Sequence, residues 1–243
     1  MEKLILMTVG TSVFDASKSF NNADTNRLKN AVEVETSSPD IENDISNAMI
    51  AASLSDRFNL TAEMASLIAF NERHPLDNCD WIVLLHSEDK KSEVCAHINA
   101  QAIVRRYFDD TASFPLTTTD DQQIAGMKNY FIMNNGGGVG IVRIDGLSPG
   151  GNETQFINAL SNLEETIKDV RGNFPHRMAY FNVTGGLKGV IPLTTVLSIQ
   201  KNMYIFYMHE ESDGLFLIDY QKLRKIIIEE NGNASEAFIG GAL

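Results

Sequence analysis

A short apolar run near the start of the chain constrains the fold most strongly. Lys3–Val9 reads KLILMTV and is closed by Gly10. A run of this kind is typical of a strand that is buried on both faces. Such strands lie in the middle of parallel sheets whose two faces are covered by helices, so this segment predicts an α/β protein.

Similar runs recur along the chain and alternate with segments of helical spacing. Further strands are predicted at residues 80–86, 140–144 and 178–183, and a terminal β-hairpin at 203–219. Helices are predicted at 40–54, 61–70, 91–108, 153–170 and 188–201, with Thr61 as an N-cap, and 220–228 fits a helix or a strand. This alternation predicts a Rossmann-like, mostly parallel sheet flanked by helices and ending in a hairpin.

One domain is expected over residues 1–228, followed by a tail at 229–243. Residues 109–139 read as an irregular insertion with a short helix around Asp121–Tyr130. The segment after Asp219 is too short for an additional effector domain. We therefore expect a ligand-binding domain that stands alone, or one whose effector is separate or missing.

Charge and cysteine content exclude several classes of function. The chain has 20 Lys and Arg against 32 Asp and Glu, a net charge of −12, which argues against a duplex nucleic-acid partner. A local anion site remains open, and residues 171–228, with 7 basic and 4 acidic residues, are the favourable side for it. Cys79 and Cys95 form no metal-ligand pattern with the five His, so we expect reduced cysteines, no metal and no cofactor.

The chain shows no sign of a membrane or secretory segment. Its first apolar residues are too few for a signal peptide, and no apolar stretch approaches the roughly 18 residues of a membrane span. A cytoplasmic protein without a membrane partner is expected.

Two segments of small and hydroxyl residues follow predicted strands, where open α/β sheets bind ligands. The first is Gly10-Thr11-Ser12, and the second is Thr184-Gly185-Gly186 with Lys188 close behind. The Gly pair gives backbone N–H groups access to a ligand, the helix predicted after it favours an anion, and Lys188 adds a positive charge. Together these groups are typical of a phosphate cradle.

The same residues also fit simpler structures. Neither the P-loop spacing nor a G-x-G-x-x-G after the first strand is present, and GGGVG at 136–140 precedes a strand. The Gly pair fits an ordinary strand-to-helix turn beside a solvated lysine, and Gly10-Thr11-Ser12 fits a capped turn. Ser87 fits a helix cap after its strand, and His86 a strand-end residue.

TVGTS at 8–12 and NVTGGLK at 182–188, in that order, resemble the CARF (CRISPR-associated Rossmann fold) family, in particular its standalone ring-nuclease-like branch. LLHSED at 84–89 and the strand–helix unit that starts with IDGL at 144–147 are also similar to this family. The likeness spans 3–220 apart from 13–75 and 109–139.

The resemblance implies a homodimer that binds cyclic oligoadenylate, most often the tetra-adenylate, across its two-fold axis. This ring is the second messenger of type III CRISPR antiviral defence. By position in the motifs, the ligand-facing residues would be Gly10, Thr11, Ser12, Thr184, Gly185, Gly186 and Lys188, with Ser87 at the periphery.

Some members of the family only sense the ring, and the ring nucleases also cut it. Cutting needs no metal, because the 2′-OH of the ligand can attack its own 3′-phosphate in line and leave a 2′,3′-cyclic phosphate. Lys188 and the Gly185-Gly186 N–H groups would stabilise the developing charge, and Ser12 would orient the 2′-OH or the phosphate. Two sites in a dimer would yield two linear di-adenylates. No general base is evident from the sequence.

Two alternatives stay open beside a ring nuclease with Ser12 and Lys188 as catalytic residues. One is a sensor that binds the ring without cutting it and signals through a separate or missing effector domain. The other is a Rossmann-like domain that binds a mononucleotide.

Overall fold

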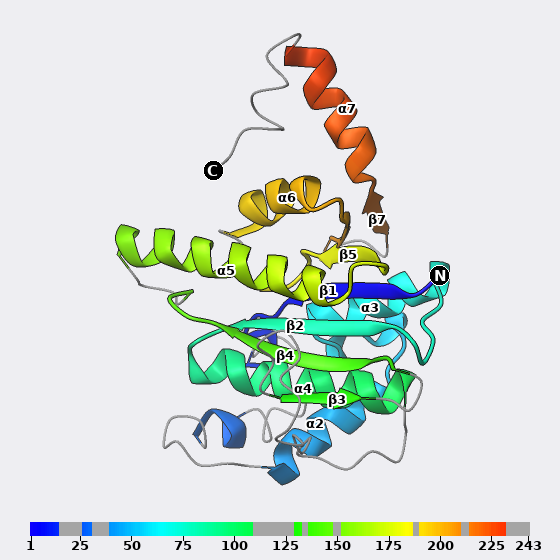
Figure 1. Cartoon of the computed structure of the whole chain (residues 1–243). Helices are drawn as coiled ribbons and strands as arrows, with labels where there is room; N and C mark the ends of the chain where they lie inside the picture. The colour runs from blue at the N-terminus through cyan, green and yellow to red at the C-terminus, as the bar shows by residue number, and fades with distance from the viewer. Residues whose placement is uncertain are drawn as a thin grey trace.

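The computed structural model describes residues 1–14, 26–30, 39–108, 129–132, 136–147, 152–186, 190–209 and 214–231. Within these ranges seven strands form one sheet in the order β3-β4-β2-β1-β5-β6-β7 (Figure 1). The strands are β1 (Lys3–Thr8), β2 (Trp81–Ser87), β3 (Asn129–Ile132), β4 (Gly138–Ile144), β5 (Met178–Asn182), β6 (Tyr204–Met208) and β7 (Leu215–Ile218). The α-helices are α2 (Pro39–Ala51), α3 (Ala62–Arg73), α4 (Lys90–Tyr107), α5 (Glu153–Asn173), α6 (Ile191–Gln200) and α7 (Tyr220–Asn231). Two 3-10 turns, η1 (Ser12–Phe14) and η2 (Leu54–Asn59), complete the set with a helical segment at 26–30.

The central position of the first strand is confirmed. β1 pairs in parallel with β2 on one side and with β5 on the other. Its residues Leu4–Met7 have no exposed surface, because helices cover both faces of the sheet. The absence of polar alternation in the sequence therefore reflects burial on two sides.

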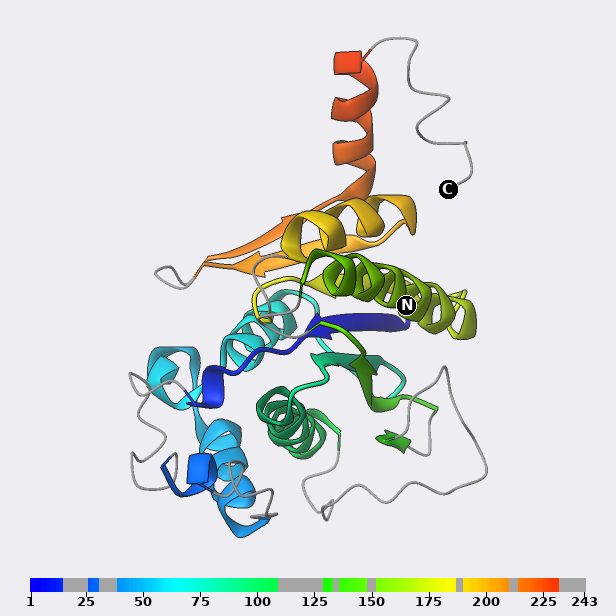
Figure 2. The ribbon, with the colours of Figure 1, turned by 90° about the vertical axis from the view of Figure 1, so that its left-hand side faces the viewer.

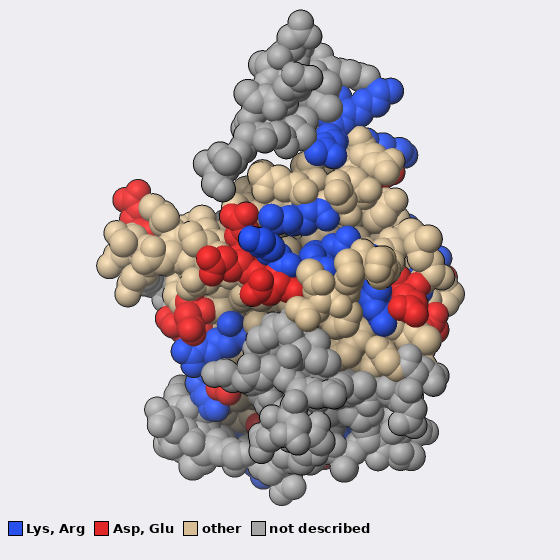
Figure 3. All heavy atoms as spheres, in the orientation of Figure 1, with Lys and Arg blue, Asp and Glu red and all other residues tan. Residues whose placement is uncertain are grey.

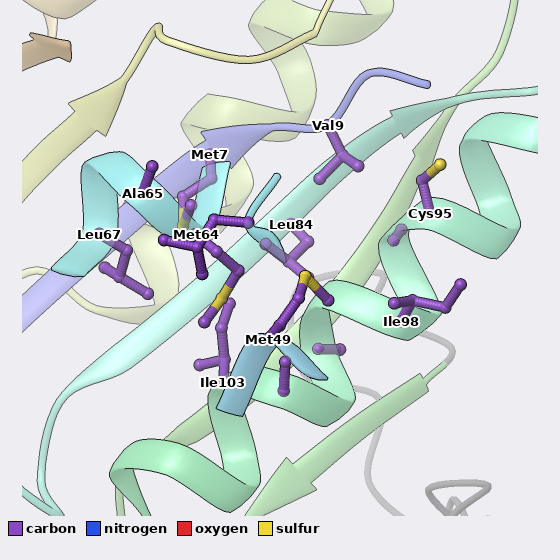
Figure 4. Close-up of a cluster of buried hydrophobic side chains, with 14 of the residues drawn as sticks. Met7, Val9, Met49, Met64, Ala65, Leu67, Leu84, Cys95, Ile98 and Ile103 are labelled. Carbon is purple, nitrogen blue, oxygen red and sulfur yellow. The ribbon is translucent and has the colours of Figure 1, made fainter. Parts of the chain in front are cut away.

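The sheet separates two hydrophobic cores, so the protein has three layers. Ile5 and Met7 of β1 point into a core shared with α2, α3 and α4. Leu4 and Leu6 point to the other face and pack with α5 and α6. Figure 2 views these layers from the side, and Figure 4 shows side chains of β1, β2, α2, α3 and α4 meeting in the first core.

Both edges of the sheet are antiparallel. β6 and β7 form the expected terminal hairpin, and β3 runs antiparallel to β4. The prediction of a helix over Asp121–Tyr130 is wrong for its last two residues, which begin β3, and residues 109–128 lie outside the described part. The segment Asn129–Ile132 contains Tyr, Phe and Ile, which favour strands, but four residues are too few for a periodicity to appear.

The helices follow the expected order, with small shifts at their ends. Thr61 caps α3 as predicted, since its hydroxyl accepts a hydrogen bond from the Met64 N–H. α6 begins at Ile191, later than the predicted start at Lys188, with Pro192 in its first turn. The segment that fitted a helix or a strand is the helix α7, which contacts α6 and extends away from the sheet in Figures 1 and 2.

A candidate ligand site at the switch point of the sheet

The order of the strands places a switch point between β1 and β5. From β1 the chain continues to β2 and β4 on one side of the sheet, and it then returns to β5 and β6 on the other side. Gly10–Ser12 follows β1, and Val183–Gly186 follows β5. The carboxyl ends of these two parallel strands lie at the same edge, so both predicted segments flank the crevice at which such sheets bind ligands.

The two segments are in direct contact, since a Cβ at Gly10 would lie 3.1 Å from the backbone nitrogen of Gly186. Thr8, the last residue of β1, adds contacts with the same loop. The Thr8 hydroxyl donates a 2.6 Å hydrogen bond to the carbonyl oxygen of Gly185. Gly186 has a φ of 85°, and a Cβ at this position would lie 2.6 Å from the Cβ of Thr8. A residue with a side chain would strain the backbone here and also collide with β1, so both the φ angle and the close approach require Gly.

Two hydrogen bonds hold Thr184 in place, one through its hydroxyl group and one through its backbone N–H. Its hydroxyl oxygen accepts a 3.0 Å hydrogen bond from the Met208 N–H at the end of β6. Its N–H donates to the side-chain oxygen of Asn182, and the amide group of Asn182 donates to the Ser66 hydroxyl on α3. The loop after β5 is thus attached to β6 and to α3, which gives its N–H groups a fixed orientation.

Glu63 is a residue that sequence reasoning missed. It lies in the first turn of α3, is 1% exposed, and its two carboxylate oxygens accept hydrogen bonds from the segment after β1. The Gly10 N–H donates to Oε1 at 2.7 Å, and the Ser12 hydroxyl donates to Oε2 at 3.2 Å. The negative charge is favourable at this position, because the amino end of a helix carries a partial positive charge.

Glu63 also touches the second segment. A Cβ at Gly185 would overlap the carboxylate of Glu63, so this glycine leaves the space that the acid side chain fills. One buried carboxylate therefore contacts both segments. In the sequence, an acidic residue two positions after a helix cap is a common stabilising feature, and nothing distinguishes Glu63 from other such residues.

Within the described residues, Thr11 is not part of these contacts. Thr11 is exposed, and its carbonyl oxygen accepts the Phe14 N–H of the 3-10 turn η1. Lys188 falls within 187–189, outside the described residues. At the switch point Gly10 therefore lies against Gly186, and Glu63 contacts Gly10, Ser12 and Gly185. Thr184 lies in the same loop as the two glycines.

Ser87 belongs to the end of the neighbouring strand β2. Its hydroxyl donates to the carboxylate of Asp89, and Asp89 rather than Ser87 is the N-cap of α4. Within the described ranges, no hydrogen bond joins Ser87 to the two segments at the switch point.

Two groups near the site have shifted pKa values. Burial raises the pKa of the Cys95 thiol well above its ordinary value, and the negative charge of Glu63 adds to this shift. Burial lowers the pKa of His86, whose Nδ1 lies 2.7 Å from the carbonyl oxygen of Ser87. Cys95 therefore stays protonated and packs as a hydrophobic side chain, and His86 is neutral near pH 7, as expected for a strand-end residue.

The surface on the side of α5 carries both signs of charge. Figure 3 shows acidic and basic side chains next to one another on this face. Lys201, at the end of α6, forms an ion pair with Glu164 of α5, and their charged atoms are 3.5 Å apart. Across the described ranges, no group of three or more His, Cys, Asp or Glu is suited to bind a metal ion, and no helix is long and apolar enough to cross a membrane.

The fold and the site place this chain in the class of open α/β proteins, with two loop segments in contact at the switch point of the sheet. Comparison with known families identifies the family within this class. The sequence model of the family described as CRISPR-associated protein (Cas_APE2256) matches residues 58–218, or 161 of the 243 residues. The chain belongs to this CRISPR-associated family. A search of curated proteins finds no match to the chain.

The matched region extends from η2 to β7, so it contains Glu63 and the Thr184–Gly186 segment. Gly10–Ser12 lies before it. Association with CRISPR agrees with the resemblance described above and does not by itself identify a ligand or a reaction.

Proposed function

We propose that this protein is a CARF domain that binds a cyclic oligoadenylate, with cyclic tetra-adenylate as its main ligand, and cuts it as a ring nuclease. The observation that carries the proposal is the close approach of Gly10 to Gly186, which brings together two segments 170 or more residues apart in the sequence. Membership of a CRISPR-associated family and the α/β fold support it.

The chemistry of the two segments fits one phosphate and its ribose. The loop after β5 offers backbone N–H groups beside Gly185 and Gly186, and Lys188 follows two residues later in the sequence. These groups suit the negative charge of a phosphate and the additional charge that develops as it reacts. Ser12 lies on the β1 side of the same contact, where a hydroxyl group suits the 2′-OH of the ribose.

Cutting requires mainly alignment. The protein has to hold the 2′-oxygen, the phosphorus atom and the departing 5′-oxygen in line. Holding the reacting atoms in this geometry accelerates the reaction without any further chemical group. The nucleophile belongs to the ligand, so the reaction needs no metal-bound water. The products are linear di-adenylates with 2′,3′-cyclic phosphate ends.

A homodimer follows from the symmetry of the ring, because two equal sites would face two equivalent phosphates. Large apolar side chains that are exposed on α5, β7 and α7 support association of the chain. They include Ile157, Phe216 and Ile226.

The test of binding uses cyclic tetra-adenylate and, as its control, the linear tetra-adenylate of the same composition. Calorimetry at the start of the reaction is expected to show tight binding of the ring with one ring per two chains, and sedimentation is expected to show a dimer. Equal affinity for the linear strand, or a stable monomer that binds neither, would contradict the proposal.

A further inference from the structure

The buried carboxylate of Glu63 lies between the two segments of the candidate site. It contacts Gly10, Ser12 and Gly185, so it touches both segments of the candidate site. Among the described residues no Lys or Arg forms an ion pair with it. Its partners are one backbone N–H and one hydroxyl, and the hydroxyl belongs to the residue expected to meet the ribose.

We propose that Glu63 is the positioning residue that fixes the Ser12 hydroxyl as a hydrogen-bond acceptor and receives its proton during cutting. This inference rests on the proposed function. The Ser12 hydroxyl carries a single proton, and it donates that proton to Glu63 Oε2. The free lone pairs of Ser12 then face the ligand, where they accept a hydrogen bond from a 2′-OH and cannot donate one to a phosphate.

This direction of the hydrogen bonds selects between two roles of Ser12 that the sequence left open. Ser12 would orient the 2′-OH, and the phosphate would be held by the loop after β5. In this arrangement Glu63 is the proton acceptor, and Ser12 connects it to the 2′-OH of the ribose. Other sites likewise activate a hydroxyl group through a hydrogen-bonded base that a neighbouring group holds in place.

Water is the only reactant that this step needs besides the ring and the two side chains. The 2′-oxygen attacks phosphorus as its proton passes to Ser12 Oγ, and the proton of Ser12 passes to Glu63 Oε2. The bond between phosphorus and the 2′-oxygen forms, the bond to the 5′-oxygen breaks, and the 5′-oxygen takes a proton from water. Glu63 then releases its proton to solvent after the product leaves.

The main variant is Glu63→Gln, which keeps the shape and replaces one oxygen by an NH2 group. The remaining oxygen can still accept the Gly10 N–H, so the structural contact is preserved. The NH2 group donates to Ser12, which turns the Ser12 proton toward the ligand and removes the proton acceptor. Glu72→Gln on the last turn of the same helix is the matched control, because it removes the same charge from an exposed side chain.

The measurement is the single-turnover rate of cutting of cyclic tetra-adenylate, together with the binding constant. For Glu63→Gln we expect a rate about 100-fold lower and binding changed less than about threefold. Glu72→Gln is expected to behave as the wild type. An unchanged rate in Glu63→Gln, or an equal loss of binding and cutting, would overturn the inference.

A double-mutant cycle with Ser12→Ala separates a role through Ser12 from an independent one. If Glu63 acts through Ser12, the double variant should cut no more slowly than the slower single variant. Losses that multiply would overturn the inference. Should Glu63→Gln fail to fold, Glu63→Asp keeps the carboxylate but shortens its reach to Ser12, so it is expected to bind the ring and to cut it more slowly. A wild-type rate in Glu63→Asp would count against the role.

The failures of the two proposals differ. A wild-type protein that leaves the ring intact contradicts the ring nuclease and with it this step. A wild-type protein that cuts the ring, with Glu63→Gln equally active, contradicts only the role of Glu63.

Discussion

The Thr8 hydroxyl donates to the carbonyl oxygen of Gly185 at 2.6 Å, and this hydrogen bond joins residues 177 positions apart in the sequence. It connects the last residue of β1 with the loop after β5, across the switch point of the sheet. Because Thr8 is buried, water does not compete for the bond. The contact therefore contributes to stability and also sets how the two segments of the candidate site meet.

Replacing Thr8 by Val tests the first of these contributions. Val has the same shape but no hydroxyl, so the Gly185 carbonyl loses its partner, and the free energy of unfolding is expected to fall by about 1–3 kcal/mol. Thr8→Ser, which keeps the hydroxyl, is expected to lose less. Urea unfolding measures both, and equal losses in the two variants would contradict the importance of this bond.

Gly185→Ala tests the contact with Glu63. The added Cβ would overlap the buried carboxylate, so we expect a loss of about 1–3 kcal/mol in stability, as for other overpacked sites. Because the collision is with one side chain, removing that side chain should relieve it. The loss in Gly185→Ala combined with Glu63→Ala is expected to be smaller than the sum of the single losses, again by urea unfolding. Strictly additive losses would show that the two residues are independent.

Lys188→Ala is expected to weaken binding of cyclic tetra-adenylate several-fold or more and to abolish cutting. The physical reason is loss of a positive charge that follows the Gly185-Gly186 pair in the sequence. Lys201→Ala is a matched control, since Lys201 is paired with Glu164 at the end of α6 and a surface pair of this kind contributes little. Binding and cutting that remain at wild-type values in Lys188→Ala would remove this residue from the site.

Ser12→Ala is expected to leave binding mostly intact and to slow cutting. In the proposed reaction the hydroxyl orients the attacking 2′-OH, whereas the loop after β5 holds the phosphate. The test compares the binding constant with the single-turnover rate. Faster turnover in the variant would instead identify Ser12 as a clamp that restrains the bound ring.

Acid pH should destabilise the protein through the buried His86 and the half-buried His97. Burial lowers the pKa of His86 and of His97 from the ordinary 6.5. The unfolded chain therefore binds protons at a pH at which the folded protein does not, so stability is complete above about pH 6.5 and is lost as the pH falls toward the lowered values.

The check is urea unfolding at about pH 7.5 and about pH 5.5. The wild type is expected to lose more stability on acidification than a variant with both His86→Gln and His97→Gln. Glu93 and Asp89 act on the pKa of His86 in the raising direction and Arg143 in the lowering direction, but burial is the largest cause and the pKa of His86 is lowered. Equal losses in both proteins would contradict the assignment.

The main elements of the fold could be predicted because burial leaves a clear pattern in the sequence. Lys3–Thr8 and Trp81–Ser87 have continuous apolar runs because both faces of their strands are covered. β3 was missed because it is a short edge strand within a polar region, where neither a long run nor a clear alternation occurs. Strand pairing across the chain is a tertiary property, so a four-residue segment does not reveal its partner.

The candidate site could be predicted only in part, for a related reason. Gly10–Ser12 and Thr184–Gly186 were recognisable because small residues stand at the ends of buried strands. Glu63 was not, because its role depends on where α3 places it relative to β1, and no local pattern encodes that distance. The Thr8 hydroxyl was missed for the same reason, since its partner lies 177 residues away.

Incubation of the purified protein with cyclic tetra-adenylate and cyclic hexa-adenylate in EDTA, followed by chromatography over time, tests the central claim most directly. We predict conversion of the preferred ring to linear di-adenylate with a 2′,3′-cyclic phosphate end. A ring that stays intact while bound to the protein would contradict cutting and identify a sensor. A ring that is neither cut nor retained would contradict binding as well.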